Sequence, residues 1–323
     1  MAHFNQERYA HMVRSGVIGH AIGDALGVPV EFMSRSELAK NPVRGMNDKR
    51  GYRTHQMPAG TWSDDTSMEI ALMQSLIDSG RFDYADIMDH FCKWWRKGEY
   101  TATGEVFDVG GTCSEAMCNY YYGKIDPVKC GGKENHNNGN GSLMRILPVA
   151  FVCYKNNLDS AARYKLAKEV SSLTHAHEIS ILGCYIYINF VFYLLNGETP
   201  YDAYVKMQQD DYSMFRKSTL SIYQHVLEEK IWLRDVDDIS ASGYVVSSLE
   251  AALWSLFTTS SYSEAVLRAV NLGKDTDTVG AITGSMAGIV YGIETFPEDW
   301  LKTLKRADYL LELSEKFAST EIA

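Results

Sequence analysis

Apolar residues recur at helical spacing along nearly the whole chain, whereas the alternating pattern of a half-buried strand is scarce. In residues 66–79, for example, Met68, Leu72 and Leu76 fall on one helical face, and Gly80 follows as an end signal. Because Gly, Asn and Asp punctuate the short joints, the pattern predicts an all-α fold rather than alternating strands and helices. We expect helices near residues 5–23, 66–79, 84–97, 112–122, 142–154, 159–174, 178–195, 199–208, 212–229, 243–258, 262–272, 278–292 and 305–317.

The composition favours one large domain without a nucleic-acid partner. The 323 residues are 46% apolar, and no linker rich in Ser, Gly or Pro divides them, so we expect one compact orthogonal helical domain over residues 1–323. The net charge of −10 argues against stable nucleic-acid binding, which needs a basic surface. Six cysteines without a C-x-x-C pair or zinc spacing predict free thiols and a cytoplasmic protein.

Residues 179–195 form an uncharged run that needs a membrane check. The run is shorter than the roughly 20 residues of a spanning helix, and it contains Ser180, Gly183 and Asn189. We therefore expect a buried core helix and no membrane association.

Glycine recurs every fourth residue at Gly280, Gly284, Gly288 and Gly292, which places these residues on one helical face. Each glycine costs about 1 kcal/mol relative to alanine inside a helix. The pattern predicts that another helix packs closely against this bare face and so fixes the direction of the residues just before it.

Two short acidic clusters lie far apart in the chain, Ser63-Asp64-Asp65-Thr66 and Asp275-Thr276-Asp277-Thr278. Oxygen ligands of this kind suit hard divalent cations such as Mg²⁺ or Mn²⁺, and together the clusters would form a two-metal hydrolytic centre. The alternative is helix capping, because Ser, Thr and Asp are favoured N-caps and Thr66 to Glu69 has the pattern of a capping box. The residues alone leave both interpretations open.

Two loops are further candidates. Gly19 to Gly27 is predicted to end the first long helix with a sharp exit, and it leads to Glu31, a lone carboxylate between apolar residues. Asn137 to Ser142 precedes an apolar helix, so its glycines either present N–H groups to a phosphate or form a plain loop with Ser142 as the N-cap.

Three single residues are weaker candidates. His175 and His177 lack the spacing of a zinc site, which leaves His175 as a ligand contact. Asp108 and Tyr244 stand at loop-to-helix corners, where the first would place a carboxylate at a cleft and the second a ring against a ligand. Each is more often structural.

The order of these motifs resembles the ADP-ribosylglycohydrolase (ADP-ribosyl-acceptor hydrolase) family, of the dinitrogenase-reductase-activating type. The resemblance spans almost the whole chain and rests on five segments, Gly23-Asp24-Ala25-Leu26-Gly27, Gly60-Thr61-Trp62-Ser63-Asp64-Asp65-Thr66, Gly139-Asn140-Gly141-Ser142-Leu143-Met144-Arg145, Thr174-His175 and Gly273-Lys274-Asp275-Thr276-Asp277-Thr278.

The resemblance implies two Mg²⁺ or Mn²⁺ ions in a cleft. One would be bound by Ser63, Asp64 and Asp65, and the other by Asp275 and Thr278, with Asp277 reaching both. The family often has Thr at the position of Ser63, and Ser keeps the hydroxyl ligand. The implied catalytic residues are Glu31, Asp64 and Asp277, and the implied substrate-binding residues are Asp108, Asn140, Gly141, Ser142, His175 and Tyr244.

The activity that the resemblance implies is hydrolysis of the glycosidic bond at C1″ of ADP-ribose attached to a protein side chain or another acceptor. Two alternatives stay open at this point. One is a non-catalytic protein that binds and sequesters ADP-ribose, and the other is a binuclear hydrolase that cuts the pyrophosphate. The acceptor itself cannot be identified from the residues.

Overall fold

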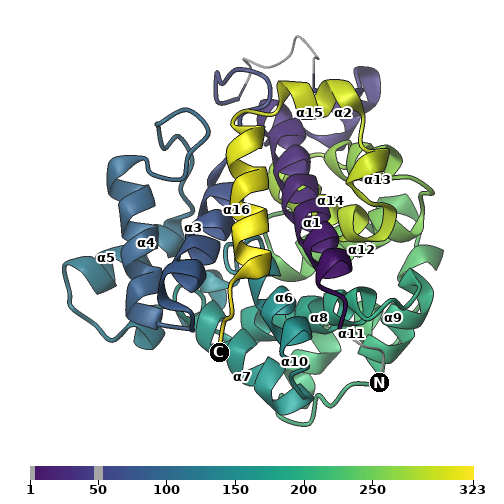
Figure 1. Cartoon of the computed structure of the whole chain (residues 1–323). Helices are drawn as coiled ribbons and strands as arrows, with labels where there is room; N and C mark the ends of the chain where they lie inside the picture. The colour runs from purple at the N-terminus through teal and green to yellow at the C-terminus, as the bar shows by residue number, and fades with distance from the viewer. Residues whose placement is uncertain (1–3, 47–53) are drawn as a thin grey trace.

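The computed structural model describes residues 4–46 and 54–323, and in these residues the chain is helical without a β-strand (Figure 1). Two isolated bridges, Gly132 with His175 and Gly139 with Tyr244, are the β-type pairings recorded in this part of the chain. The α-helices are α1 Gln6–Gly27, α2 Arg35–Lys40, α3 Asp64–Ser79, α4 Tyr84–Lys97, α5 Gly111–Tyr121, α6 Leu147–Lys155, α7 Ser160–Ser172, α8 Glu178–Leu195, α9 Pro200–Gln208, α10 Lys217–Ile222, α11 Gln224–Leu227, α12 Val245–Phe257, α13 Tyr262–Val270, α14 Thr276–Tyr291, α15 Glu298–Thr303 and α16 Ala307–Ser319.

Helices α1 and α14 form the most closely packed pair, as the glycine repeat predicts. A Cβ atom added at Gly23 or Gly284 would lie less than 3.0 Å from a backbone oxygen of the other helix, Gly280 O and Gly19 O respectively. Helix α1 ends at Gly27, within the segment predicted to end it but beyond the predicted last residue, 23. The glycines of this segment lie inside α1, where they allow the two backbones to touch.

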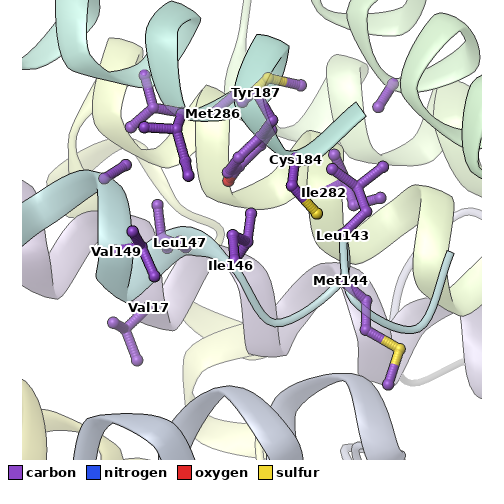
Figure 2. Packing of buried hydrophobic residues seen from close by; sticks show 14 of the residues in the cluster. Val17, Leu143, Met144, Ile146, Leu147, Val149, Cys184, Tyr187, Ile282 and Met286 are labelled. Carbon is purple, nitrogen blue, oxygen red and sulfur yellow. The ribbon is translucent and has the colours of Figure 1, made fainter. Parts of the chain in front are cut away.

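The apolar core surrounds this pair, and α8 is one of its central helices. Helix α8 is long and apolar enough to cross a membrane by length and composition, yet 89% of its apolar window is buried inside the protein. Figure 2 shows how the segment from Leu143 to Val149 packs among Val17 of α1, Tyr187 of α8 and Met286 of α14. This segment follows the glycine-rich loop directly, so the core holds the loop in place.

Helix α6 is shorter than the predicted helix over residues 142–154. It begins at Leu147, and residues 141–145 form a turn instead. The physical reason is Pro148, which lies in the first turn of α6. A backbone N–H at this position has no partner within the helix, so a proline there costs no hydrogen bond. A helix begun at Ser142 would have placed this proline in its interior. The prediction of Ser142 as a helix N-cap is therefore wrong.

Other differences are local. The helix predicted over residues 212–229 is broken at Tyr223, whose hydroxyl donates a hydrogen bond of 2.9 Å to Ile179 O at the start of α8. Helix α2 is absent from the prediction, although Ser34 and Glu37 form a complete capping box at its start. Helix α15 is also absent from the prediction.

Candidate active site and metal centre

The ends of several helices enclose a cavity of about 290 Å³. Its walls come from the N-terminal ends of α3, α5 and α14, together with the loop before α6 and the segment after α1. Ten of the residues singled out from the sequence line it: Glu31, Asp64, Asp65, Asp108, Asn140, Gly141, His175, Asp275, Asp277 and Thr278.

The two acidic clusters meet at this cavity. The Thr278 hydroxyl donates a hydrogen bond of 3.3 Å to Asp65 Oδ2, and the Ser63 hydroxyl donates to the same oxygen over 3.0 Å. A carboxylate oxygen from each of Glu31, Asp275 and Asp277 lies within 4.8 Å of the other two. Side chains from α3, α14 and the segment after α1 thus converge in space, as the two-metal interpretation requires.

These carboxylates are buried with too few hydrogen-bond donors. Asp65 Oδ1 is buried and has no hydrogen-bond partner among the described residues. Burial and the neighbouring carboxylates raise the pKa values of Asp64, Asp65 and Asp277 well above the usual range for aspartic acid. Divalent cations would offset this repulsion, and a set of carboxylate and hydroxyl oxygens fits Mg²⁺ or Mn²⁺. The residues present therefore fit a metal centre.

The start of α3 is fixed from outside by Asp24 of α1. This carboxylate accepts hydrogen bonds from the backbone N–H groups of Ser63 and Thr66, at 2.9 and 3.1 Å, and from the Thr66 hydroxyl at 2.6 Å. The predicted capping box from Thr66 to Glu69 is wrong, because α3 begins at Asp64 with Ser63 as its N-cap. Glu69 instead faces His20 Nδ1 at 2.9 Å.

The start of α14 is fixed by two neighbours. The Asn140 amide donates a hydrogen bond of 2.8 Å to Asp275 Oδ2 and a second of 2.9 Å to the Ser248 hydroxyl. The Thr276 hydroxyl donates to Gly27 O at the end of α1, over 2.8 Å. The close packing of α1 on α14 therefore places Asp275 and Asp277 beside the cluster of α3.

His55 is a site residue that sequence reasoning missed. Its Nε2 atom forms a short hydrogen bond with Glu31 Oε2, and Asp108 completes a group whose ligand atoms lie within 4.8 Å of one another. Burial raises the pKa of Glu31 to about 7, and the hydrogen bond from His55 opposes this rise. A lone histidine outside any motif gives no signal in the sequence, so only the fold identifies this partner.

Glycine residues also line the cavity, next to the carboxylates, in a part of the lining that we call the glycine wall. Gly110, Gly111 and Thr112 bring the N-terminal end of α5 to it, and Gly139 and Gly141 bring the backbone of the loop before α6. Only the second segment is a candidate for phosphate binding from the sequence, where a plain loop is the alternative. The run Gly110-Gly111-Thr112 before an apolar helix is the signal for the first.

Arg145 and His175 lie beside this wall. Arg145 is fully buried and donates a hydrogen bond to Gly141 O, while its Nε atom has no partner among the described residues. Burial lowers the pKa of His175 to about 3, so its imidazole is neutral and exchanges a hydrogen bond of 2.8 Å with the Thr174 hydroxyl. The groups that could receive an anion here are therefore the backbone N–H groups at the start of α5 and the buried guanidinium group bonded to Gly141 O.

Three predicted site residues are not among the described residues that line the cavity. Ser63 is buried at the start of α3, where its hydroxyl donates to Asp65. Ser142 is fully buried, and its hydroxyl accepts a hydrogen bond of 2.9 Å from Ser171. Tyr244 is half-buried and pairs with Gly139 through the backbone. A substrate contact by Ser142 or Tyr244 stays a prediction.

Comparison with known proteins gives a consistent result. A family model described as ADP-ribosylglycohydrolase matches residues 5–322. The chain is 32% identical over 304 residues to an ADP-ribosylarginine hydrolase Tri1 of Serratia proteamaculans, covering 94% of this chain and 78% of the relative. It is 29% identical over 288 residues to the ADP-ribosyl-[dinitrogen reductase] glycohydrolase of Rhodospirillum rubrum, covering 89% of this chain and 88% of the relative.

A solved structure has the same fold. It is titled "ADP-ribosylglycohydrolase-related protein complex", superposes with a TM-score of 0.81 at 27% identity, and the match covers 98% of this chain and 100% of that one. The family match over almost the whole chain agrees with the convergence of both acidic clusters on one cavity. The chain belongs to the ADP-ribosylglycohydrolase family.

Proposed function

We propose that this protein is a Mg²⁺- or Mn²⁺-dependent hydrolase that releases ADP-ribose from an ADP-ribosylated arginine side chain. The observation that carries the proposal is the contact between the two clusters, where the Thr278 hydroxyl donates to Asp65 inside the cavity. The arginine acceptor is supported by the relative that is 32% identical and named as an ADP-ribosylarginine hydrolase.

The charges of the cavity orient the substrate. The diphosphate of ADP-ribose is an anion, so it belongs on the glycine wall, near the N-terminal end of α5 and the buried Arg145. The ribose attached to it then faces the carboxylates, because its hydroxyl groups can donate to them. The glycosidic bond at C1″ lies on the side of the ribose away from the diphosphate, near Glu31 and Asp108.

The acidic residues would hold two cations, with Ser63, Asp64 and Asp65 on one, Asp275 and Thr278 on the other, and Asp277 reaching both. When bound, the cations would orient the ribose hydroxyls and lower the pKa of a water molecule. Asn140, through its hydrogen bond to Asp275, keeps that carboxylate aimed at the cavity.

The carboxylates of the chain also act on the reaction directly. Glu31 or Asp64, which both line the cavity, would accept the proton of the attacking water. As the bond to the acceptor breaks, positive charge develops on the ribose, and the surrounding carboxylates stabilise it. Ordinary glycosidases use paired carboxylates without a metal, so metal dependence separates the two mechanisms.

The test is release of ADP-ribose from an arginine-modified protein with Mn²⁺ or Mg²⁺, with chelator, and with the Asp277→Asn variant. We expect activity that chelator abolishes, and a loss of roughly a hundredfold or more in kcat for the variant. Chromatography of the product should show free ADP-ribose. Undiminished activity in chelator would rule out the metal mechanism, AMP as the product would indicate pyrophosphate cleavage, and tight ADP-ribose binding without turnover would indicate a binder.

A further inference from the structure

Phe32 lies at the rim of the cavity with a side chain that the protein leaves largely uncovered. It is 71% exposed although it lines the cavity, and its backbone has a φ of 65°, in the left-handed region that favours glycine. The left-handed backbone conformation weakens the folded state, and the exposed phenyl group contributes little to it. Backbone strain of this kind clusters at active sites and ligand contacts.

Two backbone hydrogen bonds to the loop before α14 hold the backbone around Phe32 in this conformation. Phe32 N–H donates a hydrogen bond of 2.6 Å to Lys274 O, and Lys274 N–H donates one of 2.6 Å to Met33 O. Lys274 is itself left-handed, with a φ of 66°. Lys274 directly precedes Asp275, and Phe32 directly follows Glu31. These hydrogen bonds therefore fix the position of Phe32 relative to two carboxylates of the site.

The surroundings of Phe32 are aromatic and anionic. The His55 ring lies 6.1 Å from the Phe32 ring and 5.1 Å from the Phe107 ring, measured between centroids. Ligand atoms of Glu31, Asp108 and His55 lie within 4.8 Å of one another, so two carboxylates adjoin this ring. Within residues 4–46 and 54–323, no Lys or Arg side chain lines the cavity. An aromatic face beside carboxylates is the pattern that recognises a flat organic cation.

The position of Phe32 assigns it to the acceptor rather than to the nucleotide. A diphosphate would be repelled by Glu31 and Asp108, so the nucleotide extends from the ribose along the glycine wall. A cationic acceptor is instead attracted to these carboxylates, and Phe32, which directly follows Glu31, lines the cavity with them. Of the common acceptors, only arginine offers a planar cation to this rim, because a serine hydroxyl or an ester carries no charge.

We propose that Phe32 determines acceptor specificity: its ring stacks on the guanidinium group of ADP-ribosylated arginine, whose charge Glu31 and Asp108 offset. The inference rests on the proposed hydrolase function. It adds a residue whose loss changes the preference among acceptors without changing the binding of ADP-ribose itself.

The experiment compares Phe32→Ala, Phe32→Leu and the wild-type protein on arginine-linked and serine-linked ADP-ribosyl peptides with Mn²⁺ present. We expect both variants to lower kcat/KM for the arginine peptide about fivefold to tenfold, the size of a partly exposed cation–π interaction. Most of this change should be in KM. Rates on the serine peptide and the inhibition constant of free ADP-ribose should stay at their wild-type values.

Two controls separate the ring from the backbone and from general effects. Phe32→Gly removes the ring and relieves the left-handed backbone, so equal effects of the Gly and Ala variants assign the loss to the ring. Tyr122→Ala removes an aromatic residue that is 66% exposed and outside the cavity lining, and it should change neither kcat nor KM.

Unchanged kcat/KM on the arginine peptide, or equal losses on both peptides, would overturn the inference. So would a wild-type protein that is active on serine linkages alone. A wild-type protein that releases ADP-ribose from neither peptide would instead contradict the proposed function, so the two failures are distinguishable.

Discussion

At the scale of single residues, the site depends on carboxylates whose positions are set by other side chains. Asp24 is the clearest case. Its carboxylate accepts hydrogen bonds from Ser63 and Thr66 and so fixes the first turn of α3, which carries Asp64 and Asp65. A helix N-terminus is normally satisfied by its own N-cap. Here Ser63 caps Asp65 N–H, and Asp24 of α1 accepts hydrogen bonds from Ser63 N–H and Thr66 N–H in addition. The position of the proposed metal ligands is thereby coupled to α1.

We predict that Asp24→Asn weakens both the fold and metal binding. In either orientation the new amide NH₂ would face a backbone N–H group, that of Ser63 or that of Thr66, and the remaining hydrogen bonds would lose their charge assistance. The free energy of unfolding should fall by about 1–3 kcal/mol and the Kd for Mn²⁺ should rise about tenfold. Denaturation and calorimetric titration measure the two effects.

Asp83 provides the matched control. It caps the start of α4 by accepting a hydrogen bond from Asp86 N–H, and it lies outside the cavity lining. Asparagine is an equally good N-cap, so Asp83→Asn should leave the Kd for Mn²⁺ unchanged. An Asp24→Asn protein with wild-type Mn²⁺ affinity would contradict the positioning role.

At the scale of elements, the contact between α1 and α14 sets the geometry of the site. The glycine faces let the two backbones touch, and the touching ends carry Glu31 beyond α1 and Asp275 before α14. A side chain in this contact would push apart the two helices and the residues that follow them.

We predict that Gly23→Ala destabilises the protein, because its Cβ would lie less than 3.0 Å from Gly280 O, a backbone atom that cannot turn aside. Overpacking of this kind costs about 1–3 kcal/mol or more. Thermal and urea denaturation should show the loss. In Gly111→Ala the added Cβ meets nothing within 4 Å, so its Tm should equal that of the wild type. Equal Tm values for all three proteins would disprove the close contact.

The helices themselves were largely predictable, and the errors have specific causes. Periodic segments such as α4 and α8 match the sequence prediction at both ends, because their apolar faces and end signals agree. The predicted first residue of α6 was wrong because the helical periodicity of residues 142–154 was given more weight than Pro148. The predicted first residue of α3 was wrong because Thr66 to Glu69 resembles a capping box. In the structure the Thr66 hydroxyl donates to Asp24 of α1 instead.

The site was predictable to the extent that its residues occur in runs. The carboxylates of both clusters and Glu31 line the cavity, as expected from the sequence. His55 and Phe32 gave no signal, because their importance comes from neighbours that are distant in the chain or from an unusual backbone angle. Ser142 was misplaced for the opposite reason, since a run of glycines suggested a helix start that the core does not form.

At the scale of the whole molecule, the fold gathers like charges that repel one another. One apolar cluster extends through the described residues, and the carboxylates lie on its inner edge at the ends of three helices. Burying these groups costs stability unless cations are bound. We therefore propose that the acidic cavity binds metal, that its anionic rim binds the acceptor and that its glycine wall binds the diphosphate.

The most direct test of this central claim is anomalous diffraction at the manganese edge from a crystal grown with Mn²⁺. The account predicts two peaks between the carboxylates of Asp65 and Asp277, with the Ser63 and Thr278 hydroxyls among the nearest oxygens. Diffraction without a peak at this cavity, from a protein whose two clusters are separated, would contradict it.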